Sequence, residues 1–239
     1  MMIGKIKTLN FKSLLILNTL ALIVTSYFFN NFIFIGVYIL FFFISFLTTK
    51  YGLKKIKELN LLQNIRAEGP AIHKKKSDTP TMGGIFIIVP FLIFLSIINI
   101  KFSSLKLFLL LITIFGFFLI GFLDDYLSIK NKENRGLKTK EKFILQSIIS
   151  IIFIFFAYEK GLINPLITIS DSLQINMNIL ILPISFLVLV GMSNSVNLTD
   201  GLDGLAAGCS GVVFYGLGTE ILMKEQQELI IFSVLCYAM

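Results

Sequence analysis

Residues 105–126 read LKLFLLLITIFGFFLIGFLDDY, an apolar run of membrane length that ends on two adjacent carboxylates. A helix needs about 20 residues to cross the hydrocarbon core of a bilayer, and the run from Leu105 to Leu123 meets that length. Asp124 and Asp125 follow side by side and repel each other, so we expect a positive partner beside them. A divalent cation is the usual partner where phosphate is also handled. The alternative is that both are solvated residues closing a helix.

The composition of the whole chain is that of a membrane protein. Of its 239 residues 56% are hydrophobic and 15% charged, and the mean hydropathy is +0.86. We therefore predict an all-α fold, a polytopic transmembrane helix bundle in one multi-pass domain over residues 1–239. The net charge of +7 does not indicate nucleic acid, because the basic residues lie between the apolar runs. Cys209 and Cys236 fall inside apolar runs, which argues against a disulfide or zinc framework.

The apolar runs predict where the chain crosses the membrane. Candidate spans are at about 32–49, 82–99, 106–123, 143–158, 178–193 and 205–223, with an incomplete one at 229–239. Residues 14–29 either span the bilayer or lie in its interface. Alternating crossings place the loops 50–80, 124–142 and 194–204 on one face. The first two of these loops hold fourteen basic residues and the opposite face holds four, so this face is predicted to be cytoplasmic.

The last apolar run is too short for a complete span. Leu229–Met239 would make about 16 Å of helix at 1.5 Å per residue, against a hydrocarbon core of about 30 Å. We therefore expect the chain to be a fragment or a truncated product.

Three polar constellations converge on the predicted cytoplasmic face. KKKSDTPTMGG (residues 74–84) opens a span, where Thr79 and Thr81 are candidate helix caps and the lysines suit either an anion site or simple topology. The acidic pair is followed by a basic loop. NSVNLTDGLDG (residues 194–204) places Asn194, Asn197 and Asp200 on one face if helical, or in a turn if its Asp-Gly steps break the helix. Carboxylates and basic loops at a lipid boundary indicate Mg²⁺-dependent phosphoryl transfer.

Three motifs in order then resemble one family. TPTMGG (79–84), GFLDDY (121–126) and NLTDGLDGLA (197–206) are similar to those of the phospho-N-acetylmuramoyl-pentapeptide transferases, the lipid I synthases of bacterial peptidoglycan assembly. The resemblance extends from about Asn64 to Gly211. It implies transfer of phospho-MurNAc-pentapeptide from UDP-MurNAc-pentapeptide to undecaprenyl phosphate, with Mg²⁺, at the inner membrane of a bacterium. The sequence does not decide whether the protein is a homodimer.

The resemblance also assigns residues. It places Asp124 and Asp125 at the catalytic and metal centre, acting either as nucleophile or as base. Substrate binding falls to Lys76, Thr81, Lys142, Asn194, Asn197, Asp200 and Asp203. Asp78 and Ser128 depart from the family pattern, which has Gly and Lys there. The family's third metal-site Asp and its histidine-rich loop lie beyond residue 239, so we expect residues 1–239 alone to be inactive.

Two other functions fit part of the sequence. Another UDP-sugar:polyprenyl-phosphate sugar-1-phosphate transferase would share the acidic motifs, and competition between donor sugars would distinguish it. An ion or proton transporter could also use Asp124, Asp125, Asp200 and Asp203. Transport carboxylates sit near the middle of the membrane, whereas these are predicted at its cytoplasmic boundary, which disfavours transport.

Overall fold

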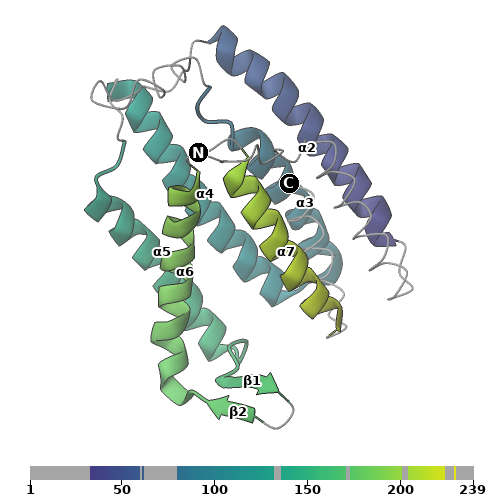
Figure 1. The fold of residues 1–239 in the computed structure, drawn as a ribbon, viewed down its shortest axis with the longest axis vertical. Coiled ribbons are helices and arrows are strands. Elements are labelled where there is room, and N and C mark those ends of the chain that lie inside the picture. Colours follow the sequence, from purple (N-terminus) through teal and green to yellow (C-terminus); the bar gives the residue numbers. More distant parts are fainter. Residues whose placement is uncertain are drawn as a thin grey trace, which may run out of the picture. The chain divides into compact units, whose positions relative to one another are not determined.

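The structure is a computed structural model that describes residues 33–59, 61, 80–131, 136–170, 173–200, 204–223 and 229 (Figure 1). The candidate segment 14–29, the site candidates Lys76 and Asp203, and residues 230–239 lie outside the described residues. Ile44–Gly211 form one compact unit, and the described residues 33–43 and 212–223 belong to a second. All the polar contacts that bear on function lie in the first unit.

Long apolar helices make up most of the described chain. They are α2 (Ile33–Glu58), α3 (Ile85–Phe102), α4 (Leu105–Asn131), α5 (Thr139–Glu159), η2 (Asn178–Leu180), α6 (Ile181–Thr199) and α7 (Leu205–Met223). Among the described residues, five helical segments are long and apolar enough to cross a membrane, formed by α2, α3, α4, α5, and η2 with α6. A helix pairs its own backbone N–H and C=O groups, and this is required in a membrane because hydrocarbon offers them no hydrogen-bond partner. The prediction of an all-α, polytopic transmembrane bundle is confirmed.

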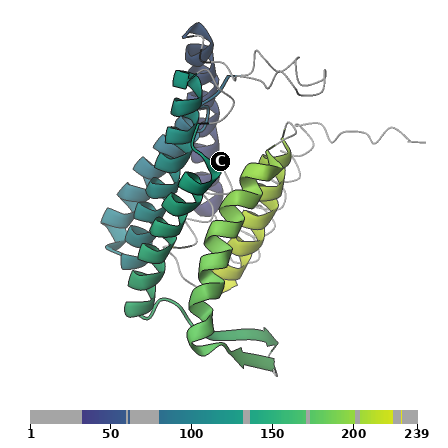
Figure 2. The same ribbon diagram turned by 90° about the vertical axis from the view of Figure 1, so that its left-hand side faces the viewer.

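Helices adjacent in sequence are also neighbours in the first unit. α3 packs against α4, α4 against α5, and α5 against α6 (Figures 1 and 2). A Cβ atom at Gly116 would lie 2.8 Å from Cδ1 of Ile149, so α4 and α5 approach closely at this glycine. The buried apolar side chains of the unit include Phe91, Leu95, Leu107, Ile120 and Ile154.

Several helices continue past the apolar runs that predicted them. α2 extends to Glu58, α4 to Asn131 and α6 to Thr199. After its apolar run α4 continues through Tyr126–Asn131, which contains neither proline nor glycine to stop it. As a result the acidic pair lies inside α4 and not in a loop after it.

A short hairpin joins α5 to α6. Its strands are β1 (Leu166–Ser170) and β2 (Leu173–Asn176), and they pair antiparallel. The sequence analysis did not predict these strands. The signal was present, because ITIS (residues 167–170) and LQIN (residues 173–176) alternate apolar and polar residues with the period of a strand.

Candidate active site

Asp124 is held by the chain segment that follows α4. Its Oδ1 accepts a hydrogen bond from the backbone N–H of Leu137 at 2.9 Å, and its Oδ2 accepts one from Nζ of Lys142, also at 2.9 Å. The side chains of Lys142 and Asp124 are only 18% and 26% exposed, so solvent screens this ion pair less than an exposed one. Lys142 is the positive partner that the adjacent carboxylates require.

Gly136 permits this arrangement. A Cβ atom at this position would clash with the backbone carbonyl of Asp124. Because only glycine lacks that atom, the segment can pass close enough to α4 for the next N–H, that of Leu137, to reach the carboxylate. The sequence analysis did not single out this glycine.

Asp125 is held by the segment before α3. The backbone N–H of Met82 donates to its Oδ2 at 3.1 Å, and the Thr81 hydroxyl also donates to this carboxylate. Met82 has a φ of 62°, a left-handed conformation that non-glycine residues rarely adopt. Such strained residues are often found at functional sites, and here the strained residue supplies the donor. The Thr81 N–H in turn bonds the carbonyl of Leu61 at 3.2 Å, which connects the segment to the end of α2.

The predicted helix cap at Thr81 is wrong. α3 begins at Ile85 with Gly84 at the N-cap position, and no side chain caps it. The two glycines and the left-handed Met82 separate Thr81 from the helix, so its hydroxyl is available to Asp125 instead. Thr79, the other candidate, lies outside the described residues.

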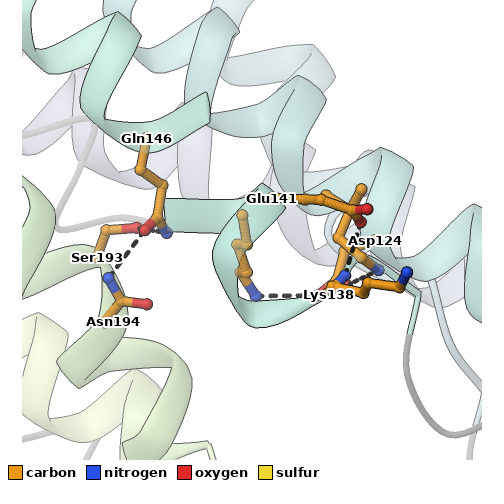
Figure 3. A network of polar contacts seen from close by, with 8 residues as sticks. Asp124, Lys138, Glu141, Gln146, Ser193 and Asn194 are labelled. Atoms are coloured by element: carbon orange, nitrogen blue, oxygen red, sulfur yellow. Dashed lines mark hydrogen bonds and ion pairs between the residues drawn. The ribbon is translucent and has the colours of Figure 1, made fainter. Parts of the chain in front are cut away.

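A second polar contact links α5 to α6 one turn further along α5. Gln146 is 1% exposed, and its Nε2 donates to Oγ of Ser193 at 3.1 Å. Its Oε1 accepts from Nδ2 of Asn194 at 2.8 Å, and that same nitrogen also donates to the carbonyl of Val190. Figure 3 shows Gln146 facing Ser193 and Asn194, with Asp124 beside the beginning of α5. Because residues four apart share one side of a helix, Lys142 and Gln146 make α5 the link between the acidic pair and α6.

The structure brings together only some of the predicted site residues. Thr81 and Lys142 contact the acidic pair directly, and Asn194 is connected to the same helix through Gln146. Asn197 and Asp200 are exposed, and among the described residues no hydrogen bond joins them to the pair. α6 ends at Thr199 with Asp200 as its C-cap. Asn194 and Asn197 are therefore in the helix, as one of the two alternatives predicted, whereas Asp200 is in the turn that follows it.

The oxygen atoms of the acidic pair suit Mg²⁺. Within the described part of the chain no three His, Cys, Asp or Glu side chains form a group that could hold a metal ion. Magnesium, however, usually binds one or two carboxylates together with water and substrate phosphates, and does not need a cage of protein ligands. Each carboxylate oxygen accepts more than one interaction, so the bonds from Leu137, Lys142 and Met82 leave acceptor capacity for a metal. The donor set therefore fits the ion.

The site contains groups that sequence reasoning did not find. Gln146 and Ser193 lie in short polar stretches of otherwise apolar helices, and nothing in the sequence shows that these two side chains meet. The N–H groups of Met82 and Leu137 carry no signal, because every residue except proline has one.

The chain belongs to glycosyl transferase family 4, whose family model matches residues 107–239, and the matched region contains the acidic pair and Lys142. Within that family it falls among the phospho-N-acetylmuramoyl-pentapeptide-transferases, whose signature 1 matches residues 76–88. That signature covers Thr81 and Met82, which hold Asp125.

Curated relatives agree with this placement. The phospho-N-acetylmuramoyl-pentapeptide-transferase of Prochlorococcus marinus strain MIT 9312 is 82% identical over 238 residues, a match covering 100% of this chain and 66% of the relative. That of P. marinus subsp. pastoris strain CCMP1986 is 57% identical over 239 residues, covering 100% and 67%. That of strain SARG is 42% identical over 199 residues, covering 82% and 54%. The chain thus spans about two thirds of the length of the first two relatives.

Proposed function

We propose that this chain carries part of an enzyme that transfers phospho-N-acetylmuramoyl-pentapeptide from a UDP carrier to undecaprenyl phosphate, giving lipid I and UMP. The observation that carries the proposal is the acidic pair of α4, held by Lys142 on one side and by the Thr81–Met82 segment on the other. The names of the relatives support the transferred group.

The reaction exchanges one phosphorus–oxygen bond for another. An oxygen of the lipid phosphate bonds to the phosphorus that carries the sugar, the bond from that phosphorus to the bridging oxygen breaks, and UMP leaves. Both substrates and the leaving group are anionic, so the site must supply positive charge. Bound Mg²⁺, which Asp124 and Asp125 would hold, supplies charge neutralisation to the transferring phosphoryl group.

Lys142 supplies a second, permanent positive charge. Its ammonium group has three donors, so it can retain Asp124 while donating to a phosphate oxygen of the substrate. The ion pair with Asp124 also fixes the position of the ammonium group before substrate arrives. An ammonium already in place costs no reorganisation during the reaction, which is how preorganised charges lower a barrier.

The proposed location is the cytoplasmic face of a bacterial inner membrane. The fourteen-to-four distribution of basic residues supports this orientation. The UDP-linked donor is soluble and the acceptor is a lipid, so a site at the end of membrane-crossing helices can reach both. Asp124 and Asp125 lie in the last two turns of α4, beyond its apolar run, where the chain would emerge from the hydrocarbon.

The test is transfer from UDP-MurNAc-pentapeptide to undecaprenyl phosphate in detergent, with and without Mg²⁺. Because the chain spans about two thirds of its relatives' length, it is assayed alone and fused to the C-terminal third of the strain MIT 9312 relative. We expect Mg²⁺-dependent lipid I formation by the fusion. In that protein Asp124→Asn and Asp125→Asn should each reduce turnover by at least about 10²–10³-fold, the usual cost of one lost charge-stabilising contact.

Glu159→Gln is the matched control, because it makes the same change of carboxylate to amide at the exposed C-terminal end of α5. It should leave turnover unchanged. Near-normal turnover in both aspartate variants would show that the acidic pair has no catalytic role and only occupies the end of a helix. Transfer from UDP-GlcNAc in preference to the pentapeptide donor would favour the related sugar-phosphate transferases instead.

A further inference from the structure

The hairpin between α5 and α6 has one apolar and one mostly polar face. Ile167 of β1 pairs with Ile175 of β2, and Leu173 lies two residues from Ile175 on the same side of β2. The opposite face carries the pair Thr168 and Gln174, together with the pair formed by Leu166 and Asn176. The hairpin is therefore amphipathic, with an apolar face and a mostly polar face.

The described residues leave the apolar face exposed. Ile167, Leu173 and Ile175 are 38%, 50% and 43% exposed, and all four residues of β2 are exposed. An isolated two-stranded hairpin is marginally stable at best in water, and it needs a surface on which to bury its apolar face. Something outside the described residues must therefore cover this face for the hairpin to persist.

The position of the hairpin indicates the bilayer as that surface. It connects the C-terminal end of α5 to the beginning of α6, two helices able to cross a membrane, so it is held where both reach one surface of the bilayer. The strands run crosswise to α6 in both views (Figures 1 and 2), so they would lie along the surface of a bilayer that α6 crosses. Exposed apolar side chains continue on both sides of it, with Tyr158 near the end of α5 and Ile179 and Leu180 just before α6.

We propose that the β1–β2 hairpin lies in the lipid–water interface, with Ile167, Leu173 and Ile175 directed into the acyl chains. Thr168, Gln174 and Asn176 face water. The interface suits this element because the free edges of two strands need hydrogen bonds, which the hydrocarbon centre does not offer and the headgroup region does. The hairpin thereby anchors the α5–α6 end of the bundle at a fixed depth. This inference rests on the membrane-crossing helices and not on the proposed transferase reaction.

The absence of tryptophan from the chain allows a direct test. Ile175→Trp and Gln174→Trp each introduce a single fluorophore, on adjacent residues of β2 that face opposite sides. Each variant of the chain is reconstituted in vesicles of phosphatidylcholine, with and without bromine on the acyl chains. Fluorescence is then quenched by the brominated lipid or by soluble acrylamide. Leu173→Trp repeats the measurement at a second apolar position, in case Ile175→Trp does not fold.

The expected result is an emission shifted to shorter wavelength and strongly quenched by brominated lipid for Ile175→Trp and Leu173→Trp. Gln174→Trp should be quenched mainly by acrylamide. Equal quenching by acrylamide at all three positions would show that the hairpin stands in water and would overturn the proposal. Protection of the two apolar positions from both quenchers would also overturn it, because another part of a protein would then cover the face.

Discussion

Two polar contacts begin on neighbouring turns of α5, and they differ in kind. Lys142 forms an ion pair with Asp124 of α4. The other carboxylate oxygen of Asp124 accepts a hydrogen bond from the Leu137 N–H, in the segment before α5. Gln146 forms a neutral contact with Ser193 and Asn194 of α6, and it is almost completely buried. A charged pair that is partly open can exchange its partners for a metal or a phosphate. A buried amide network has no such freedom. We therefore infer that the Lys142 contact takes part in the reaction and that the Gln146 contact holds α5 and α6 in position.

The largest effect should come from removing the charge of the first contact. Lys142→Met leaves Asp124 without its cation and removes the proposed charge on the substrate phosphate. Turnover of the fusion protein should fall by about 10²–10³-fold. Lys138→Met removes an exposed lysine four residues earlier and should change turnover little. Equal losses in both variants would mean that only the net charge of the segment matters.

A smaller effect should follow from a methyl group beside the first contact. Gly136→Ala forces the segment away from the carbonyl of Asp124 and weakens the bond from the Leu137 N–H. Overpacking of this kind costs about 1–3 kcal/mol, measured as a lower midpoint of thermal unfolding in detergent. Gly121→Ala is the control, because it adds the same methyl group within α4 where no atom lies within 4 Å. A midpoint unchanged by Gly136→Ala would show that the close approach is not needed.

The smallest effect on turnover should come from the second contact. Gln146→Leu keeps the approximate volume but removes the hydrogen bonds to Ser193 and to Asn194, whose Nδ2 keeps only its bond to the carbonyl of Val190. Each lost hydrogen bond costs about 0.5–1.5 kcal/mol, so the thermal midpoint should fall while turnover at permissive temperature falls less than in Lys142→Met. Gln174→Leu, an exposed position on the hairpin, should leave the midpoint in place. If Gln146→Leu reduced turnover as much as Lys142→Met with no change in stability, the distinction between the two contacts would fail.

The sequence predicted the charged contact better than the neutral one. Asp124, Asp125 and Thr81 stand in recognisable motifs and Lys142 was assigned through the family resemblance. The structure brings these four together. Gln146 could not be predicted as the partner of Asn194, because the two are 48 positions apart in the sequence and both lie in apolar helices. The role of Thr81 was predicted as a helix cap and proved to be a contact with Asp125, because the left-handed Met82 delays the start of α3.

What the sequence determined by itself is the class of fold: long apolar runs must form helices in a membrane, because hydrocarbon offers the backbone no other hydrogen-bond partner. It also determined that two adjacent carboxylates follow one of those runs. Only the tertiary structure decided which groups hold them. The donors come from two separate parts of the chain, Met82 before α3 and Leu137 with Lys142 at the beginning of α5, and two of them are backbone N–H groups. Such groups reach a carboxylate only when turns and close helix contacts bring them there. Because every residue except proline has an N–H, the sequence does not mark which ones will do so.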